Sequence, residues 1–273
     1  MDLVTQGSNV PLTFPVLVYH KVDPRFEFSI ARISPNRFKS HLDWLLRQGY
    51  QTITISEAAR LVRENQLVPD KTVAIVFDDG FDGIYKYAWP LLRERKMTAT
   101  VFMVAGFAGK QDEWDVKIGW RRFRHLSWDQ LRELSEAGIE IGSHSLNHPD
   151  LTRLENDALQ YELRESRSIL KEKVGCDIRA FSVPFGTSSP LVSDSVMDNG
   201  YESMVVVRSG PYEKTNSGMI TFAGVCVYLT TGYNRLEGAL QGRPPSLLGR
   251  MVQKAIGQCA RWTPLVKGRP TYP

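Results

Sequence analysis

The stretch VAIVFDDGFDG, residues 73–83, places two adjacent carboxylates directly after an apolar run. The run Val73 to Phe77 is continuous, which is typical of a strand in a parallel sheet that is covered on both faces. The carboxylates of Asp78 and Asp79 disfavour each other's ionised form, because they are like charges at close range. In isolation FDDG indicates an Asp-Gly turn, so a functional role for the pair depends on a compensating partner elsewhere in the chain.

Short β-rich runs alternate with helical patterns on both sides of this stretch. The predicted strands are residues 16–20, 51–55, 73–79, 99–104, 139–144, 179–184, 202–207 and 225–229. Predicted helices begin at Ser34-Pro35, at Ser56-Glu57, at Ser127 with Gln130, and at Thr152 with Glu155, which are typical capping residues. This alternation predicts an α/β fold, and its length favours a distorted (β/α) barrel over an open sheet.

Several of the predicted strands end in residues suited to binding or catalysis. In α/β barrels and open α/β sheets, chemistry gathers at the C-terminal ends of the strands. Those ends carry His20, the pair Asp78-Asp79, His144 and Pro184. The topology therefore predicts a functional site at this end of the barrel.

A second motif, SHSLNHPDL at residues 143–151, holds His144 and His148 four residues apart. This spacing places both imidazoles on one side of a turn, and Pro149 disfavours a helical His148, so a single turn or tight loop is expected. An HxxxH pair alone is weak evidence, because most such pairs are surface or capping histidines. Two neutral imidazoles and one carboxylate nevertheless form a recognised catalytic zinc set with an open position. A metal bound this way would stabilise both aspartates and leave one of them to accept a proton from water.

Three motifs in order resemble the polysaccharide deacetylase family, also called the NodB-homology or carbohydrate-esterase deacetylases. They are FDDG (77–80), HSLNH (144–148) and VPFG (183–186), and the likeness extends over roughly residues 14–210. The family fold is a distorted (β/α) barrel, usually of seven strands, which agrees with the alternation above. The resemblance implies metal-dependent hydrolysis of an N-acetyl group, or sometimes another N-acyl group, on an amino sugar. An N-acetylated carbohydrate is therefore the expected partner.

The resemblance also implies a role for each motif residue. Asp78 would be the general base, and Asp79 would bind the metal together with His144 and His148. The expected cofactor is one divalent transition metal, with zinc as the first expectation, although the same ligands accommodate cobalt, nickel or iron.

The third motif would form the wall of the substrate groove. The residues concerned are Pro184, Phe185 and Gly186, and the backbone N–H of Phe185 would help to hold the oxyanion. Residues 106–126 form a long connection rich in aromatic and charged residues. Its aromatic residues, Trp120 among them, are expected either to stack on sugar faces or to cover the rim of the barrel.

The general acid of the family usually comes from a C-terminal Leu-x-His motif, and none of the five histidines here follows His148. In a branch with a circularly permuted motif order, an N-terminal Tyr-His takes this role, and LVYH ends in His20. We therefore expect His20 to be the acid, with a core histidine as the alternative explanation. His125 is the second candidate for the acid, whereas His41 falls inside a predicted helix, where a surface or packing role is expected instead.

A further departure lies at Ser182, where many members carry an arginine two residues before the motif proline. This difference leaves two alternatives to amino-sugar deacetylation. One is a related amidohydrolase acting on an N-formyl or small non-sugar amide. The other is a catalytically impaired carbohydrate-binding protein, although a protein that only binds has no need of Asp78.

Charge divides the chain into two predicted parts, a barrel at residues 1–234 and a basic tail at residues 235–273. The tail holds seven Lys or Arg residues and one acid, in a chain whose net charge is +4. Apolar residues in 246–262 recur at helical spacing, which predicts a helix packed on or beside the barrel, with peripheral membrane contact as the alternative. A nucleic-acid partner is not expected, because no recognition motif accompanies the charge.

The remaining composition is ordinary for a globular protein that buries a large core, with 42% hydrophobic and 23% charged residues. The three cysteines are odd in number and far apart, so neither a disulfide framework nor a thiolate zinc site is expected. The N-terminal residues lack the pattern of a signal peptide, and no apolar run reaches the length of a membrane span. The sequence predicts a cytoplasmic protein, at most peripheral to a membrane.

Overall fold

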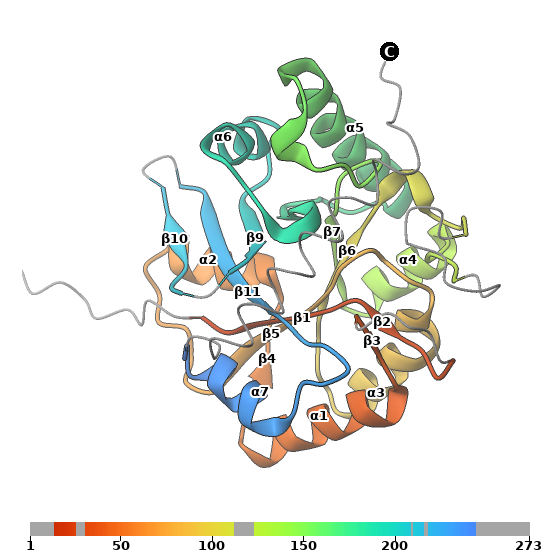
Figure 1. The fold of residues 1–273 in the computed structure, drawn as a ribbon, viewed down its shortest axis with the longest axis vertical. Coiled ribbons are helices and arrows are strands. Elements are labelled where there is room, and N and C mark those ends of the chain that lie inside the picture. The colour runs from red at the N-terminus through yellow and green to blue at the C-terminus, as the bar shows by residue number, and fades with distance from the viewer. Residues whose placement is uncertain (1–13, 26–30, 112–122, 209, 216–217, 244–273) are drawn as a thin grey trace, which may run out of the picture.

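The computed structural model describes residues 14–25, 31–111, 123–208, 210–215 and 218–243. Its centre is a closed barrel of parallel strands (Figure 1). The barrel strands are β1 (Val16–Tyr19), β5 (Thr72–Phe77), β6 (Thr100–Met103), β7 (Glu140–Ser143), β8 (Ala180–Ser182), β9 (Ser203–Val207) and β11 (Ile220–Cys226). They follow the order β1-β11-β9-β8-β7-β6-β5, and the pairing of β5 with β1 closes the ring. The predicted distorted (β/α) barrel is confirmed.

In the described part of the chain, four short strands lie outside this ring. Strand β4 (Gln51–Thr52) pairs with the start of β5, and β10 (Glu213–Lys214) runs antiparallel to β11. Strands β2 (Lys21–Val22) and β3 (Arg32–Ile33) form a separate parallel pair. The predicted strand at 51–55 is therefore real but short, and it is not part of the barrel wall.

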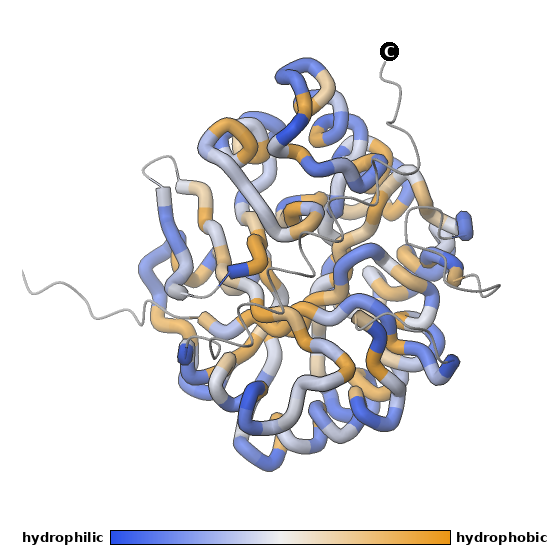
Figure 2. The backbone as a smooth tube through the Cα atoms, viewed as in Figure 1, coloured by the Kyte–Doolittle hydropathy of each residue, from blue (hydrophilic) through white to orange (hydrophobic). Residues whose placement is uncertain are grey.

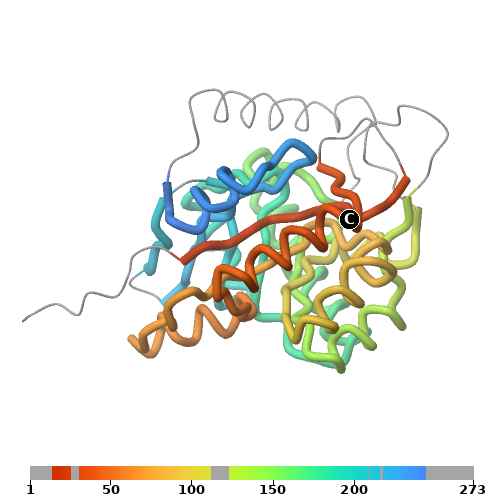
Figure 3. Tube along the Cα trace, turned by 90° about the horizontal axis from the view of Figure 1, so that it is seen from below, coloured from red at the N-terminus to blue at the C-terminus, as the bar shows by residue number. Residues whose placement is uncertain are grey.

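Helices surround the strands (Figures 1 and 3). They are α1 (Pro35–Arg47), α2 (Ile55–Arg63), α3 (Trp89–Glu94), α4 (Trp128–Glu136), α5 (Asn156–Val174), α6 (Pro190–Asp198) and α7 (Tyr233–Leu240). Apolar residues concentrate along the central strands, and hydrophilic residues lie toward the periphery (Figure 2). None of the helices described is long and apolar enough to cross a bilayer.

The barrel strands are buried on both faces, as the nearly continuous apolar runs of several of them predict. Along β1, Leu17 and Tyr19 belong to one cluster of buried residues and Val16 and Val18 to another, because successive side chains point to opposite faces. The first cluster contains the apolar faces of the outer helices α1, α4 and α5. The second therefore faces into the barrel, where residues of α2 join it.

Two of the predicted helix starts are confirmed by their caps. The side chain of Ser34 accepts the N–H of Arg37, and Pro35 is the first residue of α1. Helix α4 begins with a full capping box, in which Ser127 and Gln130 each accept the other's backbone N–H. Both caps follow directly from local sequence, which is why the sequence located them.

The other two predicted helix starts were wrong. Helix α2 is capped by Thr54, whose side chain accepts the N–H of Glu57, rather than starting at Ser56. Thr152 lies in a short 3-10 turn, where its hydroxyl bonds Asp150, and α5 starts at Asn156.

The last predicted strand, 225–229, overlaps only the final residues of β11. The apolar run before it is interrupted by Gly224, which hides the strand in the sequence. In the structure a Cβ at Gly224 would lie 2.7 Å from Val18 Cγ2, so the close pairing of β11 with β1 requires glycine there.

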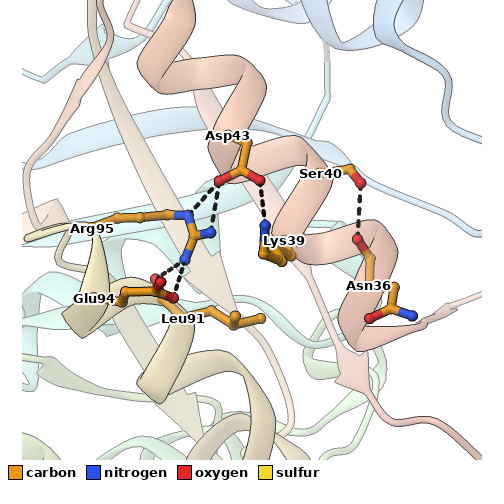
Figure 4. A network of polar contacts seen from close by, with 7 residues as sticks. All are labelled: Asn36, Lys39, Ser40, Asp43, Leu91, Glu94 and Arg95. Carbon is orange, nitrogen blue, oxygen red and sulfur yellow. Dashed lines mark hydrogen bonds and ion pairs between the residues drawn. The ribbon is translucent and has the colours of Figure 1, made fainter.

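A polar network fastens α1 to the end of α3 (Figure 4). Asp43 accepts hydrogen bonds from Arg95 at 2.7 Å and from Lys39 at 2.8 Å. The Arg95 side chain is nearly buried and also donates to the carbonyl of Leu91. An arginine with several fixed acceptors positions the two helices against each other more firmly than an exposed ion pair does.

We expect Phe38→Ala to lower the free energy of unfolding by about 3–5 kcal/mol, the usual cost of removing a buried aromatic ring. Phe38 is fully buried on α1, and its ring centroid lies 5.1 Å from that of Tyr19 and 5.6 Å from that of Phe77. Chemical denaturation measures the change. The control is the neighbouring Lys39→Ala, which removes a half-exposed ion pair and should cost about 0.5 kcal/mol. Equal effects of the two variants would contradict this account of the core.

Two predictions fall on residues that the structure does not describe. Trp120 lies in 112–122, and the helical pattern at 246–262 lies in 244–273.

Helix α7, which packs beside β1, crosses the predicted boundary between residues 234 and 235 (Figure 3). Cys176 and Cys226 are free thiols.

Candidate active site

The ends of β1, β5, β7 and β8 bring the predicted site residues together. Because all four strands are parallel, their C-terminal ends open on the same rim of the barrel. Tyr19 pairs with Phe77, and the N–H of Asp78 donates to the carbonyl of Tyr19 at 2.9 Å. His20 and Asp78 therefore leave neighbouring strands side by side.

Asp79, His144 and His148 form a compact set of potential metal ligands. Asp79 Oδ1 lies 3.5 Å from His144 Nε2 and 3.4 Å from His148 Nε2, and the ligand atoms all lie within 4.8 Å of one another. Tetrahedral zinc has bonds of about 2.0–2.2 Å to such atoms, which places pairs of ligands roughly 3.3–3.5 Å apart. The geometry of these side chains therefore fits a bound divalent cation.

The protonation of the two histidines supports the same conclusion. His144 Nδ1 lies 2.8 Å from the carbonyl oxygen of Ser182, which can only accept, so Nδ1 carries the proton and Nε2 presents its lone pair. Burial lowers the pKa of His144 to about 4. Burial also lowers the pKa of His148 well below its usual value, and the neighbouring histidines add to that shift. Both imidazoles are therefore neutral, which is the form that binds a metal.

Asp78 lies beside this set in a different environment. The side chain is buried, and within the described residues its Oδ1 atom has no hydrogen-bond partner. Burial raises the pKa of Asp78 to about 6, while His20 and a hydrogen bond with the Ser182 side chain act in the opposite direction. A carboxylate with a raised pKa and an available oxygen is suited to accept a proton near neutral pH.

Two further histidines lie at the same rim. His20 is partly exposed, and its charge acts on the pKa of both Asp78 and His148. His125 is buried, and its Nδ1 donates to the carbonyl of Asp79 at 2.9 Å while its ring stacks on Phe81. The fifth histidine, His41, is instead buried on α1 and hydrogen-bonds Tyr19, so it has the packing role rather than the surface role, the two roles expected for it.

Backbone strain concentrates at this rim. The described non-glycine residues with positive φ are Asn65, Lys71, Asp79, Lys96, Ser145, His148 and Phe185. Asp79, Ser145, His148 and Phe185 belong to the three sequence motifs, whereas the other three lie in turns. Strain of this kind persists where the surrounding structure fixes it, and it is common at active sites.

The VPFG motif forms one side of the site. The Phe185 ring meets the His148 ring edge-on, with centroids 4.7 Å apart, and the neighbouring Pro184 is buried. Gly186 has a φ of +69°, and a Cβ there would lie 2.3 Å from Val207 Cβ. The close approach to β9 therefore requires glycine and fixes the position of Phe185 beside the histidines.

Some contacts at the site carried no signal in the sequence. The position of Ser182 was noted as a departure from the family pattern, but its two contacts, to Asp78 and to His144, depend on the register of β8 against its neighbours. The bond from His125 to Asp79 depends on a long connection that returns to β5. Local sequence describes neither feature, because both join segments far apart in the chain.

Comparison with known proteins agrees with these motifs. The family model described as polysaccharide deacetylase matches residues 65–204. The chain is 28% identical over 200 residues to the putative polysaccharide deacetylase YxkH of Bacillus subtilis (strain 168), covering 73% of this chain and 66% of that protein. It is 21% identical over 229 residues to the poly-beta-1,6-N-acetyl-D-glucosamine N-deacetylase of Escherichia coli (strain K12), covering 72% of this chain but only 34% of that protein.

Solved structures share the fold. The structure of IcaB from Ammonifex degensii is 25% identical, with a TM-score of 0.71 and coverage of 85% of this chain and 97% of that one. The Streptococcus pyogenes deacetylase PplD, in complex with acetate, is 22% identical, also with a TM-score of 0.71, and the match covers 86% of this chain and 100% of that one. With its motifs assembled on one rim and half of its length matched by the family model, the chain belongs to the polysaccharide deacetylase family.

Proposed function

We propose that the protein is a metal-dependent hydrolase that removes an N-acetyl group from an amino sugar in a polysaccharide, oligosaccharide or glycan precursor. The observation that carries the proposal is the placement of Asp78 beside the ligand set Asp79, His144 and His148. Membership in the deacetylase family and the name of the Escherichia coli relative support this substrate class.

The residues Asp79, His144 and His148 would hold one divalent transition metal, zinc first, with cobalt, nickel and iron as alternatives. When bound, such an ion polarises the acyl carbonyl and lowers the pKa of water at the site. Its charge would also favour the ionised form of Asp78, which burial alone disfavours.

The remaining roles, proton transfer and stabilisation of the developing negative charge, belong to residues of the chain itself. Asp78 accepts the proton of the attacking water, since its Oδ1 atom has no hydrogen-bond partner among the described residues. The backbone N–H of Phe185, held by the strained turn of the VPFG motif, stabilises the oxygen on which negative charge develops. Pro184 and Gly186 complete that wall of the groove. His20 protonates the departing amine.

The role of His20 has a specific test in His20→Asn. An amine is a poor leaving group and needs a proton, whereas the phenolate of an activated acetyl ester leaves without one. We therefore expect the variant to lose about 10²- to 10⁴-fold in kcat on an N-acetyl amide and much less on the ester. Initial rates on the two substrates, with the same metal loading, give the comparison.

The matching control is His125→Asn, since His125 is the other candidate acid at the rim. It should lower both rates together, because His125 contacts the backbone of Asp79 rather than the leaving group. An amide-selective loss in this variant, and not in His20→Asn, would transfer the acid role to His125.

The substrate class is tested with the metal-loaded protein and a panel of acetylated compounds. β-1,6- and β-1,4-linked N-acetylglucosamine oligomers, an N-formyl sugar and a small non-sugar amide are each assayed for released acid and free amine. Release of acetate from an oligomer supports the proposal. Turnover of the small amide alone would favour the related amidohydrolase, and tight oligomer binding without turnover would favour a carbohydrate-binding protein.

A further inference from the structure

The four residues 145–148, here called the ligand loop, connect the end of β7 to the second histidine of the ligand set. Two of these residues, Ser145 and His148, have positive φ values, 68° and 59°. Residues other than glycine rarely adopt positive φ values, so contacts from outside the ligand loop must stabilise this conformation.

One support comes from α5, where Glu162 is fully buried. Its Oε2 atom accepts the backbone N–H groups of Leu146 and Asn147, both at 2.9 Å. Its Oε1 atom accepts the side-chain amide of Asn147 at 2.8 Å. Hydrogen bonds to a carboxylate are about twice as strong as neutral ones, and these three hold the centre of the ligand loop to one helix.

A second support for the ligand loop comes from the segment after β6. The N–H of Ala105 donates to the carbonyl of Ser145 at 3.1 Å, and that of Gly106 donates to the carbonyl of Leu146 at 2.9 Å. A Cβ at Gly106 would lie 2.6 Å from the Leu146 oxygen, so this close approach of the two segments requires glycine at position 106. The ligand loop is therefore hydrogen-bonded both to Glu162 and to the backbone of the segment after β6.

We infer that Glu162 is a positioning residue for metal binding: its carboxylate holds the ligand loop in the conformation that aims His148 at Asp79. The inference rests on the proposed metal site and adds a residue that no sequence motif contains. Within the ligand loop, His148 N–H also donates to Ser145 Oγ at 3.0 Å, so a shift at Leu146 and Asn147 reaches His148 directly. Substituting residues that orient metal ligands without binding the metal commonly lowers metal affinity by about 10- to 100-fold.

The experiment measures Co²⁺ binding by metal-free protein, through the dissociation constant and the visible absorption spectrum of the bound ion. We expect Glu162→Ala to weaken binding by about 10- to 100-fold and to change the spectrum. Glu162→Gln should lose less, because its amide oxygen still accepts the two backbone N–H groups. The matched control is Glu172→Gln on the same helix, whose side chain is 69% exposed and which should bind as the wild type does.

Thermal unfolding of the metal-free proteins separates positioning from a loss of fold. If Glu162→Ala does not fold, Asn147→Ala decides, because it removes only the Oε1 contact and should still weaken Co²⁺ binding. Folded Glu162 and Asn147 variants that bind Co²⁺ with wild-type affinity and spectrum would overturn the inference alone. A wild-type protein that binds no Co²⁺ would overturn the metal site and the inference with it.

Discussion

Asp78→Asn should lower kcat on the N-acetylated substrate by about 10²- to 10⁴-fold and leave the metal content unchanged. The substitution keeps the size of the side chain but removes its ability to accept a proton. Because Asp78 lies outside the set Asp79, His144 and His148, the ligands are unaffected. Rates are measured with metal content determined on the same preparations.

The control for this variant is Asp70→Asn, which changes an exposed carboxylate in the turn before β5. It should retain wild-type kcat and metal content. Full activity of Asp78→Asn would show that another group accepts the proton, and the paired aspartates would then have one functional member. Loss of metal from Asp78→Asn would instead make Asp78 a ligand and contradict the division of roles between the two aspartates.

The sequence predicted most of the barrel because several of its strands are nearly continuous apolar runs. In β5 all six residues are buried, and five of them, Val73 to Phe77, are apolar. This apolar run predicts burial on both faces of the strand. The last strand was misplaced because Gly224 interrupts its apolar run, although tight pairing with β1 is what requires that glycine. The same residue that weakens the sequence pattern is needed for the barrel to close.

The candidate site likewise contains residues that the sequence could locate and a residue that it could not. Residues at strand ends, such as Asp78 and His144, could be located because a parallel barrel fixes where those ends lie. Glu162 could not be located from the sequence, because its contact with the ligand loop depends on the packing of α5 against β7. Contacts between a helix face and a loop depend on tertiary packing, which leaves no periodic or local pattern in the chain.

The double variant His144→Ala/His148→Ala should reduce bound transition metal from near one per chain to near none, and activity should disappear with it. The two imidazoles supply two of the three ligand atoms in the candidate set, and a single carboxylate holds a divalent ion weakly in water. Elemental analysis of the purified proteins, with zinc supplied to both and excess removed, measures the change. Thermal unfolding with and without zinc gives a second readout, because a ligand that binds only the folded state raises its stability.

His20→Asn provides the control, since His20 lies at the same rim but outside the ligand set. It should keep its metal and its zinc-dependent rise in melting temperature, while the double variant should show neither. Equal metal content in the double variant and the wild type would mean that the buried, neutral imidazoles are structural. The ligand set Asp79, His144 and His148 would then be wrong, and the proposed hydrolysis would lose its metal site. Loss of metal from the double variant only would establish the ligand set on which the roles of Asp78, His20 and Glu162 depend.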